Sequence, residues 1–447
     1  MSLTTCSPPP DPRLATLHTP RSCTRRTLLQ LVFILTIPVL SACADRVTDA
    51  TSPSSLSSSS SSTRSFPTTL ASVGWQEQGR LLVADHPVTM SPVVAVRVYA
   101  LLGVAQYGAV VDADKQVEAD GSLTSDGFGD GGRSRFEAER GASAAASARI
   151  LSYIFTDAAT ALAQRLSAEA NAGPGGVHPS FTRGAKIGSA FADMLWARND
   201  GYSNAWTGTL SVGEGFWTRN PAPVGGTLPP LAAPQFAAMK PYFLTSAAQL
   251  HSATPPTFGS TAFYTDLAEV STISRTRSET QLAAAVAWNL ANGTVTALGR
   301  WDEFASQFIT DNRLDERAAA HVFALTNAAA MDAVIGCWEA KFSYDYIRPY
   351  QVDQTAYPIT TPIGRPNHPS YPSGHSCVSA AAATVIKAFF PEHGEWLDAR
   401  VVDAGMSRIY GGLHYRFDIT AGQALGRAAA GVALAYDRDR GLLASVR

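Results

Sequence analysis

Three short stretches toward the C-terminal end of the chain combine residue types that could bind an oxyanion and transfer a proton. The first, KFSYDYIRP, places Lys341 and Arg348 seven residues apart, so on a helix the two cations would share one face. Pro349 disfavours a helical conformation at Arg348, and we expect the helix to end there. Two long cations at a helix end could hold an oxyanion, although two solvated surface charges would explain the same spacing.

The second stretch, HPSYPSGHS, begins at His368 and contains a Pro-Ser-Gly turn before an apolar segment that is typical of a helix. A helix N-terminus presents free backbone N–H groups to an anion, and Gly374 would allow the anion to approach the backbone closely. Ser373 adds a hydroxyl donor, and His375 could exchange a proton with a bound group. The alternative is ordinary helix capping by the Ser-Gly pair.

The third stretch, SRIYGGLHYRFD, places Arg408 six residues before His414, across a Gly-Gly turn. Asp418 follows His414 by four residues, which would put both on one face of the next helix. A carboxylate that accepts the proton of one imidazole nitrogen makes the other nitrogen a better nucleophile or metal ligand. The alternative is an exposed pair of modest strength.

Together, the three stretches supply the parts of one site for a tetrahedral or trigonal-bipyramidal oxyanion. The cations would neutralise its charge, and a backbone N–H group would hold one of its oxygens. One histidine would attack or ligate the central atom, while the other would move protons.

The segments that must position these residues have apolar side chains at three- and four-residue steps, which is typical of helices. Long helices joined by short turns predict an all-α fold built from helix bundles. Residues 202–260 are rich in Gly, Pro and Trp and predict a long irregular excursion, a kind of segment that is usually functional or capping. The expected helices include residues 92–113, 141–170, 184–200, 280–309, 314–347 and 375–390.

The N-terminal segment has the features of an export signal. Arg25 and Arg26 precede an apolar run that is too short to span a bilayer comfortably and that ends in Leu-Ser-Ala-Cys at Cys43. The twin arginines resemble a twin-arginine signal, and the last four residues resemble a bacterial lipobox, in which the cysteine is lipidated. We therefore expect export to the cell envelope or periplasm with a lipid anchor at Cys43. A plain secretory signal or a membrane anchor is the alternative.

The chain is expected to have four parts. Residues 1–43 form the signal peptide with its lipobox, and the Ser-rich residues 44–66 form a flexible tether. Residues 67–280 form an N-terminal helical half, and residues 281–447 form a C-terminal helical bundle that carries the site.

Composition excludes some classes of protein. The hydrophobic share of 45 % and charged share of 16 % indicate a globular chain, and the net charge of -2 provides no basic surface for nucleic acid. Only Cys337 and Cys377 lie in the expected folded part, so no disulfide framework is present. We expect two buried free thiols, with a single bridge as the alternative. No Cys/His cluster has zinc-site spacing.

The three stretches, written Lys-x6-Arg-Pro, Pro-Ser-Gly-His and Ser-Arg-x5-His-x3-Asp, resemble a known signature. It belongs to the superfamily shared by type 2 phosphatidic acid phosphatases and vanadium-dependent haloperoxidases, and it is complete here from Lys341 to Asp418. The resemblance implies an all-α fold with a four-helix-bundle core around the site. In the phosphatases the histidine of the third motif forms a phosphohistidine, whereas in the haloperoxidases it coordinates vanadate.

Three features favour the haloperoxidase branch. The chain has a long helical half before the motifs, Trp338 stands three residues before Lys341, and aromatic residues surround His414. The sequence also lacks the run of transmembrane helices found in lipid phosphatases. An acid phosphatase that uses His414 as its nucleophile is the main alternative. A lipid-anchored protein that binds an oxyanion without catalysis is a third hypothesis, which the presence of His375 beside His414 disfavours.

The resemblance implies a vanadate cofactor, in a site that phosphate could also occupy. His414 would be the metal ligand, with Asp418 orienting it, and His375 would be the acid–base residue. Lys341 would also polarise bound peroxide. The expected groups around the vanadate oxygens are Lys341, Arg348, Ser373, Gly374 and Arg408.

The implied substrates are hydrogen peroxide, a halide and an unknown organic acceptor. Bromo- and iodoperoxidases tend to carry a histidine at the position of His368, where fungal-type chloroperoxidases carry phenylalanine. The resemblance therefore favours bromide or iodide, with Trp338 as a second residue near the halide. The alternative is that His368 has no halide role. The sequence leaves the oligomeric state open, with a homodimer as one alternative.

Overall fold

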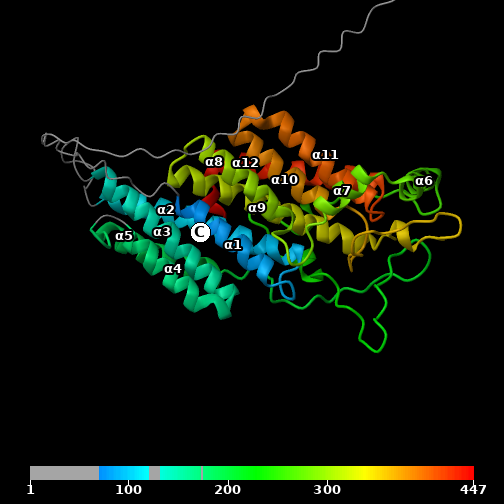
Figure 1. The fold of residues 1–447 in the computed structure, drawn as a ribbon, viewed down its shortest axis with the longest axis horizontal. Helices are drawn as coiled ribbons and strands as arrows, with labels where there is room; N and C mark the ends of the chain where they lie inside the picture. The colour runs from blue at the N-terminus through cyan, green and yellow to red at the C-terminus, as the bar shows by residue number, and fades with distance from the viewer. Residues whose placement is uncertain (1–69, 120–130, 173–174, 447) are drawn as a thin grey trace, which may run out of the picture. The chain divides into compact units, whose positions relative to one another are not determined.

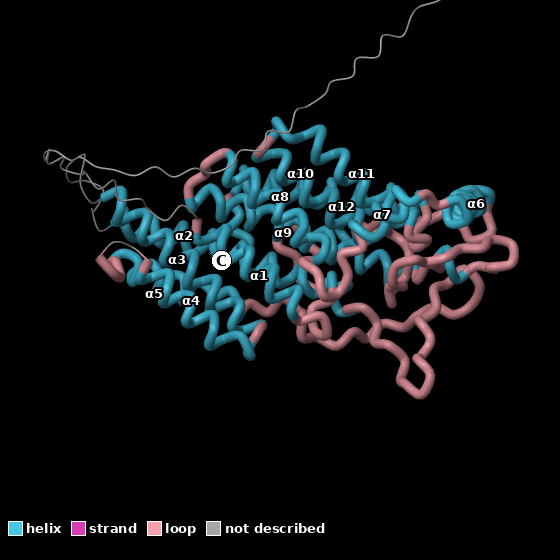
Figure 2. Tube along the Cα trace, in the orientation of Figure 1, coloured by secondary structure: helices cyan, strands magenta, loops and turns pink. Residues whose placement is uncertain are grey.

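The regular elements of the protein are helices throughout the part that the structure describes. The structure is a computed structural model that describes residues 70–119, 131–172 and 175–446. In these ranges no strand forms, and the only β feature is an isolated bridge between Phe216 and Tyr346 (Figure 2). The expected all-α fold class is confirmed. The predicted signal peptide and tether lie outside the described residues.

Five helices of the N-terminal half form a layer in which α3 packs along α5 and α2 packs against both (Figure 1). The α3–α5 contact is close because glycines occupy positions at which any larger side chain would collide with the facing helix. A Cβ atom on Gly184 would lie 2.0 Å from the carbonyl oxygen of Ala138. The predicted helix over 141–170 is wrong as a single element, because it breaks between α3 and α4. The five are α1 (Ala71–Asp85), α2 (Pro92–Ala119), α3 (Gly131–Ile154), α4 (Ala159–Asn171) and α5 (Pro179–Ala197).

Seven helices follow, and α9 is central among them because it packs against α2 on one side and against α10 and α12 on the other. The predicted helix over 280–309 is two helices, separated where Leu290 and Gly293 adopt φ angles of 43° and 83°. The seven are α6 (Thr261–Thr276), α7 (Glu279–Ala287), α8 (Thr296–Asp311), α9 (Glu316–Tyr344), α10 (Gly374–Phe389), α11 (Gly394–Tyr410) and α12 (Arg416–Arg440). Short 3-10 helices are η1 (Thr156–Ala158), η2 (Pro234–Ala238), η3 (Ala247–Leu250), η4 (Pro349–Gln351), η5 (Pro391–His393) and η6 (Leu442–Ser445).

One hydrophobic core joins the two predicted halves. Its buried side chains come from helices on both sides of residue 280, and α7 itself crosses the expected boundary. Helices α2 and α9 are long and apolar enough to cross a membrane, but 83 % and 89 % of their most apolar windows are buried inside the protein. Both are therefore core helices of this fold. The division at residue 280 stays a prediction.

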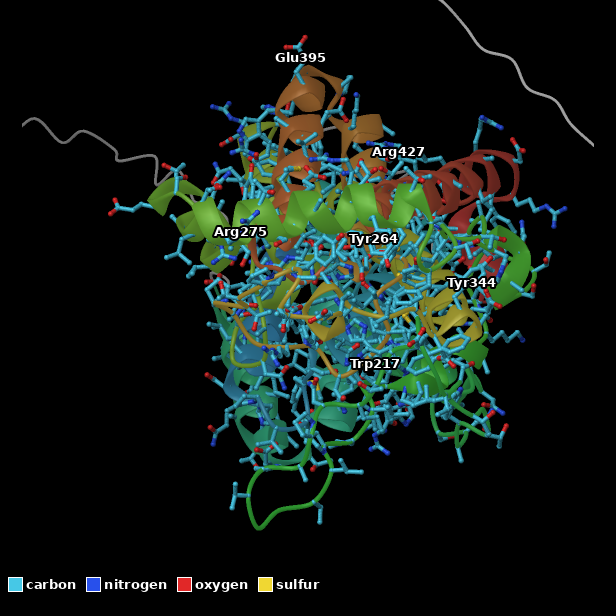
Figure 3. All side chains as sticks on the ribbon, turned by 90° about the vertical axis from the view of Figure 1, so that its right-hand side faces the viewer. Trp217, Tyr264, Arg275, Tyr344, Glu395 and Arg427 are labelled. Carbon is cyan, nitrogen blue, oxygen red and sulfur yellow. The ribbon has the colours of Figure 1, made fainter. Side chains whose placement is uncertain are left out.

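The irregular excursion over 202–260 is present, and α9 holds it in place. The buried carboxylate of Asp332 accepts the backbone N–H groups of residues 242–244 at 2.7–3.0 Å. The indole Nε1 of Trp338 donates to the carbonyl of Ala232 at 2.9 Å. Near the end of α9, the backbone N–H of Trp217 donates to the carbonyl of Asp345 at 2.7 Å, and Figure 3 shows Trp217 on the same side of the protein as Tyr344. These bonds position the excursion over one end of the bundle.

Helix α12 lies against α10 through two glycines. A Cβ atom on Gly422 would come within 2.6 Å of the Ser373 carbonyl oxygen, and one on Gly426 within 2.3 Å of the Cys377 carbonyl oxygen. Because both oxygens belong to backbone, only a shift of the whole helix could relieve such contacts. The close packing sets the distance between the start of α10 and the start of α12, which both carry site residues.

We expect Gly426→Ala to destabilise the protein by about 1–3 kcal/mol, since the added methyl group must push α12 from α10. The matched control is Gly431→Ala on the same helix, where an added Cβ meets nothing within 4 Å. Because alanine has a greater helix propensity than glycine, this control variant should be more stable than the wild type by about 0.5–1 kcal/mol. Urea denaturation of both variants measures the difference, and equal effects at the two positions would contradict the packing argument.

Candidate active site

The three cations predicted from the sequence meet in one buried cluster. Lys341, Arg348 and Arg408 are almost completely buried, and none of them forms an ion pair with a described residue. Lys341 and Arg348 do not share a helix face, because α9 ends at Tyr344 and Asp345 adopts the left-handed conformation, with φ 46°. The expectation of a helix that runs to Arg348 is therefore wrong. The extended backbone at Arg348 turns its side chain back into the cluster.

Lys341 holds the loop that precedes α10. Its ammonium donates to the carbonyl oxygens of Pro369 at 2.9 Å, Ser370 at 2.7 Å and Pro372. An ammonium group has three N–H donors, so these carbonyls use all of them. Burial lowers the pKa of Lys341 to about 8. Direct contact of Lys341 with an oxyanion or a peroxide stays a prediction.

Arg348 lies between two of the predicted histidines. Its Nη1 donates to the carbonyl of Leu413 at 2.9 Å and lies 3.0 Å from Nε2 of His414. Its Nε and Nη2 donate to the carbonyl of His368, and Nη2 lies 3.2 Å from Nδ1 of the same residue. A guanidinium group can only donate, so Nε2 of His414 is the acceptor in its contact.

His414 and Asp418 form the predicted pair, at 2.8 Å between Nδ1 and Oδ2. The predicted shared helix face is wrong, since α12 begins at Arg416 and His414 precedes it. The contact forms because the chain enters α12 directly after His414, which brings Asp418 in the first helical turn under the imidazole ring. With its proton on Nδ1, His414 has a lone pair on Nε2 that is suited to ligate a metal. Burial, followed by the charge of Arg348, lowers the pKa of His414 well below its usual value and keeps the ring neutral.

Ser373 and Gly374 form the start of α10 without ordinary capping. Ser373 is the N-cap residue, but its side chain makes no capping bond, and its buried Oγ has no partner among the described residues. A Cβ atom on Gly374 would meet the Trp338 ring at 3.2 Å, so glycine keeps this helix start open. The Ser-Gly pair thus leaves a hydroxyl donor and backbone N–H groups for another group.

His375 follows directly, and its buried Nε2 has no partner in the described part of the chain. Burial is the main cause that lowers its pKa well below the usual value, and the charge of Arg408 acts in the same direction. The neutral ring can therefore accept a proton at neutral pH. Arg408 donates to Oγ of Ser407 at 3.1 Å and to the carbonyl of Ala285 at 3.3 Å.

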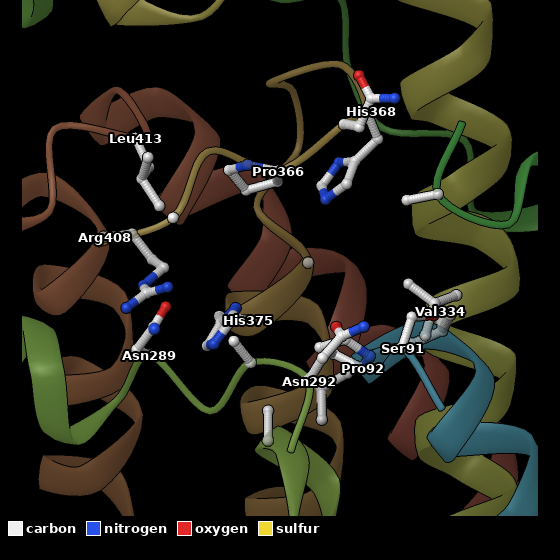
Figure 4. Close-up of a pocket in the computed structure, with 18 of the residues that line it drawn as sticks. Ser91, Pro92, Asn289, Asn292, Val334, Pro366, His368, His375, Arg408 and Leu413 are labelled. Atoms are coloured by element: carbon white, nitrogen blue, oxygen red, sulfur yellow. The ribbon is translucent and has the colours of Figure 1, made fainter. Parts of the chain in front are cut away.

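Some of these groups line a cavity of about 300 Å³ (Figure 4), whereas Lys341, Arg348, Ser373 and Asp418 lie behind its wall. Figure 4 shows Arg408 on one side, His375 in the centre and His368 above it. The ring of Trp338 lies 5.1 Å from that of His368, between ring centres. The predicted site residues that line the cavity are Trp338, His368, Gly374, His375, Arg408 and His414.

The donor set fits an oxyanion. Burial of an unpaired charge costs several kcal/mol, so a cluster of three cations that no described carboxylate pairs with favours a bound anion. Two buried polar atoms, Oγ of Ser373 and Nε2 of His375, are left for its oxygens. No group of three or more His, Cys, Asp or Glu in the described ranges could hold a bare metal ion. Vanadate, an anion that needs one histidine ligand, fits such a site.

One contributing residue was missed from the sequence. Ser370 donates from Oγ to Oδ2 of Asp418 at 2.6 Å, while its carbonyl oxygen accepts from Lys341. Ser370 thereby links the first motif to the third. The only sequence signal for this role was its position inside the second stretch. Cys337 and Cys377 are free and buried, as expected.

We expect sulfate to stabilise the protein, because a tetrahedral anion should bind among the cations and shift unfolding by mass action, by about 2.7 kcal/mol at a hundredfold excess over Kd. Arg408→Met should remove most of this effect. The control is Arg400→Met on the same helix, whose side chain pairs with Asp403 at the surface. Thermal unfolding at increasing sulfate measures the shift. An undiminished shift in Arg408→Met would contradict an anion site at this place.

Comparison with known proteins agrees with the geometry. Residues 317–442 match the family model of the PAP2 superfamily. The crystal structure of a bacterial vanadium-dependent iodoperoxidase has a TM-score of 0.67 and 22 % identity, covering 83 % of this chain and 97 % of that one. No curated protein matches the sequence significantly.

Two structures of bacterial vanadium-dependent chloroperoxidase are also similar. The holo-type has a TM-score of 0.63 and 13 % identity, covering 81 % of this chain and 94 % of that chain. The apo-type has a TM-score of 0.62 and 14 % identity, covering 79 % and 95 %. Residues 317–442 therefore match the PAP2 superfamily, and the chain has the fold of the bacterial vanadium-dependent haloperoxidases.

Proposed function

We propose that this protein is a vanadate-dependent haloperoxidase that oxidises bromide or iodide with hydrogen peroxide to hypohalous acid. The observation that carries the proposal is the buried cluster of Lys341, Arg348 and Arg408, which has no ion pair within the described part of the chain and borders a neutral histidine. A long N-terminal half packs on the motif-bearing helices. The similar iodoperoxidase structure covers 83 % of this chain, so the likeness extends beyond the motif-bearing helices and supports the same function.

The residues would divide the work as follows. Vanadate, when bound, supplies Lewis-acid activation of peroxide. Arg348 and Arg408 would neutralise the charge of the cofactor, and Oγ of Ser373 with the N–H of Gly374 would donate hydrogen bonds to its oxygens. Nε2 of His414 would be the ligand of the cofactor, while Asp418 keeps the proton on Nδ1.

His375 is the proposed proton acceptor. Its Nε2 is buried and has no partner among the described residues, so it is available to the incoming peroxide. The lowered pKa keeps this nitrogen unprotonated at neutral pH, and the ring can accept a proton when peroxide binds and return it to the leaving oxygen.

His368 is the proposed contact for the halide. Its ring is held by Arg348 and lies beside Trp338 at the cavity wall. Burial is the main cause that lowers the pKa of His368 well below the usual value, so the imidazole acts as a neutral polar group. A polar ring at this wall supports bromide or iodide as the halide.

The test is a halide-oxidation assay on vanadate-reconstituted protein with chloride, bromide and iodide in parallel. We expect oxidation of iodide and bromide only after vanadate addition, with competition by phosphate, and no activity in His414→Ala.

His368→Phe should lower the rate with bromide relative to that with iodide. Hydrolysis of p-nitrophenyl phosphate without halide oxidation would instead establish the acid phosphatase alternative, which the PAP2 match keeps open.

The same proposal includes export and a lipid anchor at Cys43, outside the described residues. We expect the protein in the membrane fraction of the cell envelope, since a lipid chain on Cys43 would hold it there. Cys43→Ser should prevent labelling with a palmitate analogue, whereas Cys337→Ser should not affect it. Equal labelling of both variants would contradict the anchor.

A further inference from the structure

The cavity has a second wall that the oxyanion site does not use. Opposite Arg408 it is formed by apolar side chains from four helices, and Figure 4 shows Pro92 and Val334 on this side, with His375 between them and Arg408. Peroxide and halide ions gain nothing from apolar surroundings, whereas an organic molecule gains about 25 cal/mol per Å² of buried apolar surface. The apolar residues of this wall are Pro92, Val93, Val96, Ala297, Val334 and Val378.

The charges around the cavity limit what this wall could bind. Among the described residues no Asp or Glu lines the cavity, while Arg408 and Arg365 do, so a cationic molecule would find no counter-charge there. An anionic molecule would compete for the cations of the oxyanion site. A neutral molecule is therefore the occupant that the lining favours.

One polar group at the rim of the cavity, the side-chain amide of Asn292, could orient a bound molecule. Nδ2 of Asn292 donates to the carbonyl of Pro87 at 2.7 Å, so Oδ1 is the amide atom that remains available to a bound molecule. An amide oxygen accepts a hydrogen bond, so it would recognise an O–H or N–H group. An apolar cavity of about 150 Å³ can hold benzene, so the cavity has room for one aromatic ring beside the oxyanion.

We propose that Val93, Val96, Ala297, Val378 and Asn292 form an acceptor subsite that binds a neutral, single-ring phenol for halogenation inside the cavity. This inference depends on the proposed function. The hypohalous acid formed there transfers its halogen as the O–X bond breaks. The ring supplies the electron pair of the new C–X bond, and the displaced ring proton joins the hydroxide to form water.

The test uses vanadate-reconstituted full-length protein with iodide, peroxide and p-cresol, in the presence of excess methionine as a trap for free hypoiodous acid. The readout is iodocresol formed per peroxide consumed, which does not depend on the overall rate. We expect the wild type to retain at least half of this yield with the trap present. A yield that falls to that of reagent hypoiodous acid under the same conditions would overturn the proposal.

Val96→Phe fills the subsite and should lower the trapped yield at least fivefold. Its matched control, Val98→Phe, makes the same change at a buried position of α2 that does not line the cavity, and it should keep the wild-type yield. Equal yields from the two variants would overturn the subsite. Absence of any peroxide consumption with iodide would instead refute the proposed function.

Binding of p-cresol to the vanadate-free protein provides a readout without turnover. We expect calorimetric binding that Asn292→Ala weakens about fivefold, the effect of one neutral hydrogen bond. This side chain is exposed, so the variant should fold even if Val96→Phe does not. Unchanged affinity in Asn292→Ala, or no binding to the wild type, would overturn the proposal.

Discussion

Three buried cations, which form no ion pair with any residue that the structure describes, are the constraint on which the rest of this structure depends. A buried charge needs compensation, and here backbone carbonyl oxygens provide it. Those of Pro369, Ser370 and Pro372 surround Lys341, and those of His368 and Leu413 accept from Arg348. Carbonyl oxygens carry only partial charge, so the cluster keeps a positive potential that an oxyanion can satisfy.

The same bonds explain why the site loops have little freedom. The loop before α10 directs its carbonyls inward to Lys341. Directly after this loop, Oγ of Ser373 and Nε2 of His375 are buried and have no partner among the described residues. Ser370 then links this loop to Asp418, which orients His414. The cations thus organise the other groups around the proposed anion site.

The helices and the irregular excursion around the site hold these groups in place. Helix α9 carries Lys341 at one end and packs against α2 of the N-terminal half, so the long first half supports the motif-bearing helices directly. Asp332 and Trp338 on the same helix hold the irregular excursion near the cavity. The valines of α2 complete the apolar wall, which a short motif-bearing bundle alone would lack.

The sequence alone determined the residue types and the helical class, because local spacing and periodicity encode these features. The grouping of three stretches into one site was inferred from their complementary chemistry and from the family resemblance. It did not determine where helices end: Asp345 and Leu290 adopt left-handed conformations that propensity does not reveal. Only the tertiary structure decided that Lys341 binds carbonyls, that Arg348 contacts His414, and that Ser370 supports Asp418. These contacts join residues 28 to 66 positions apart, and long-range packing rather than local pattern selects them.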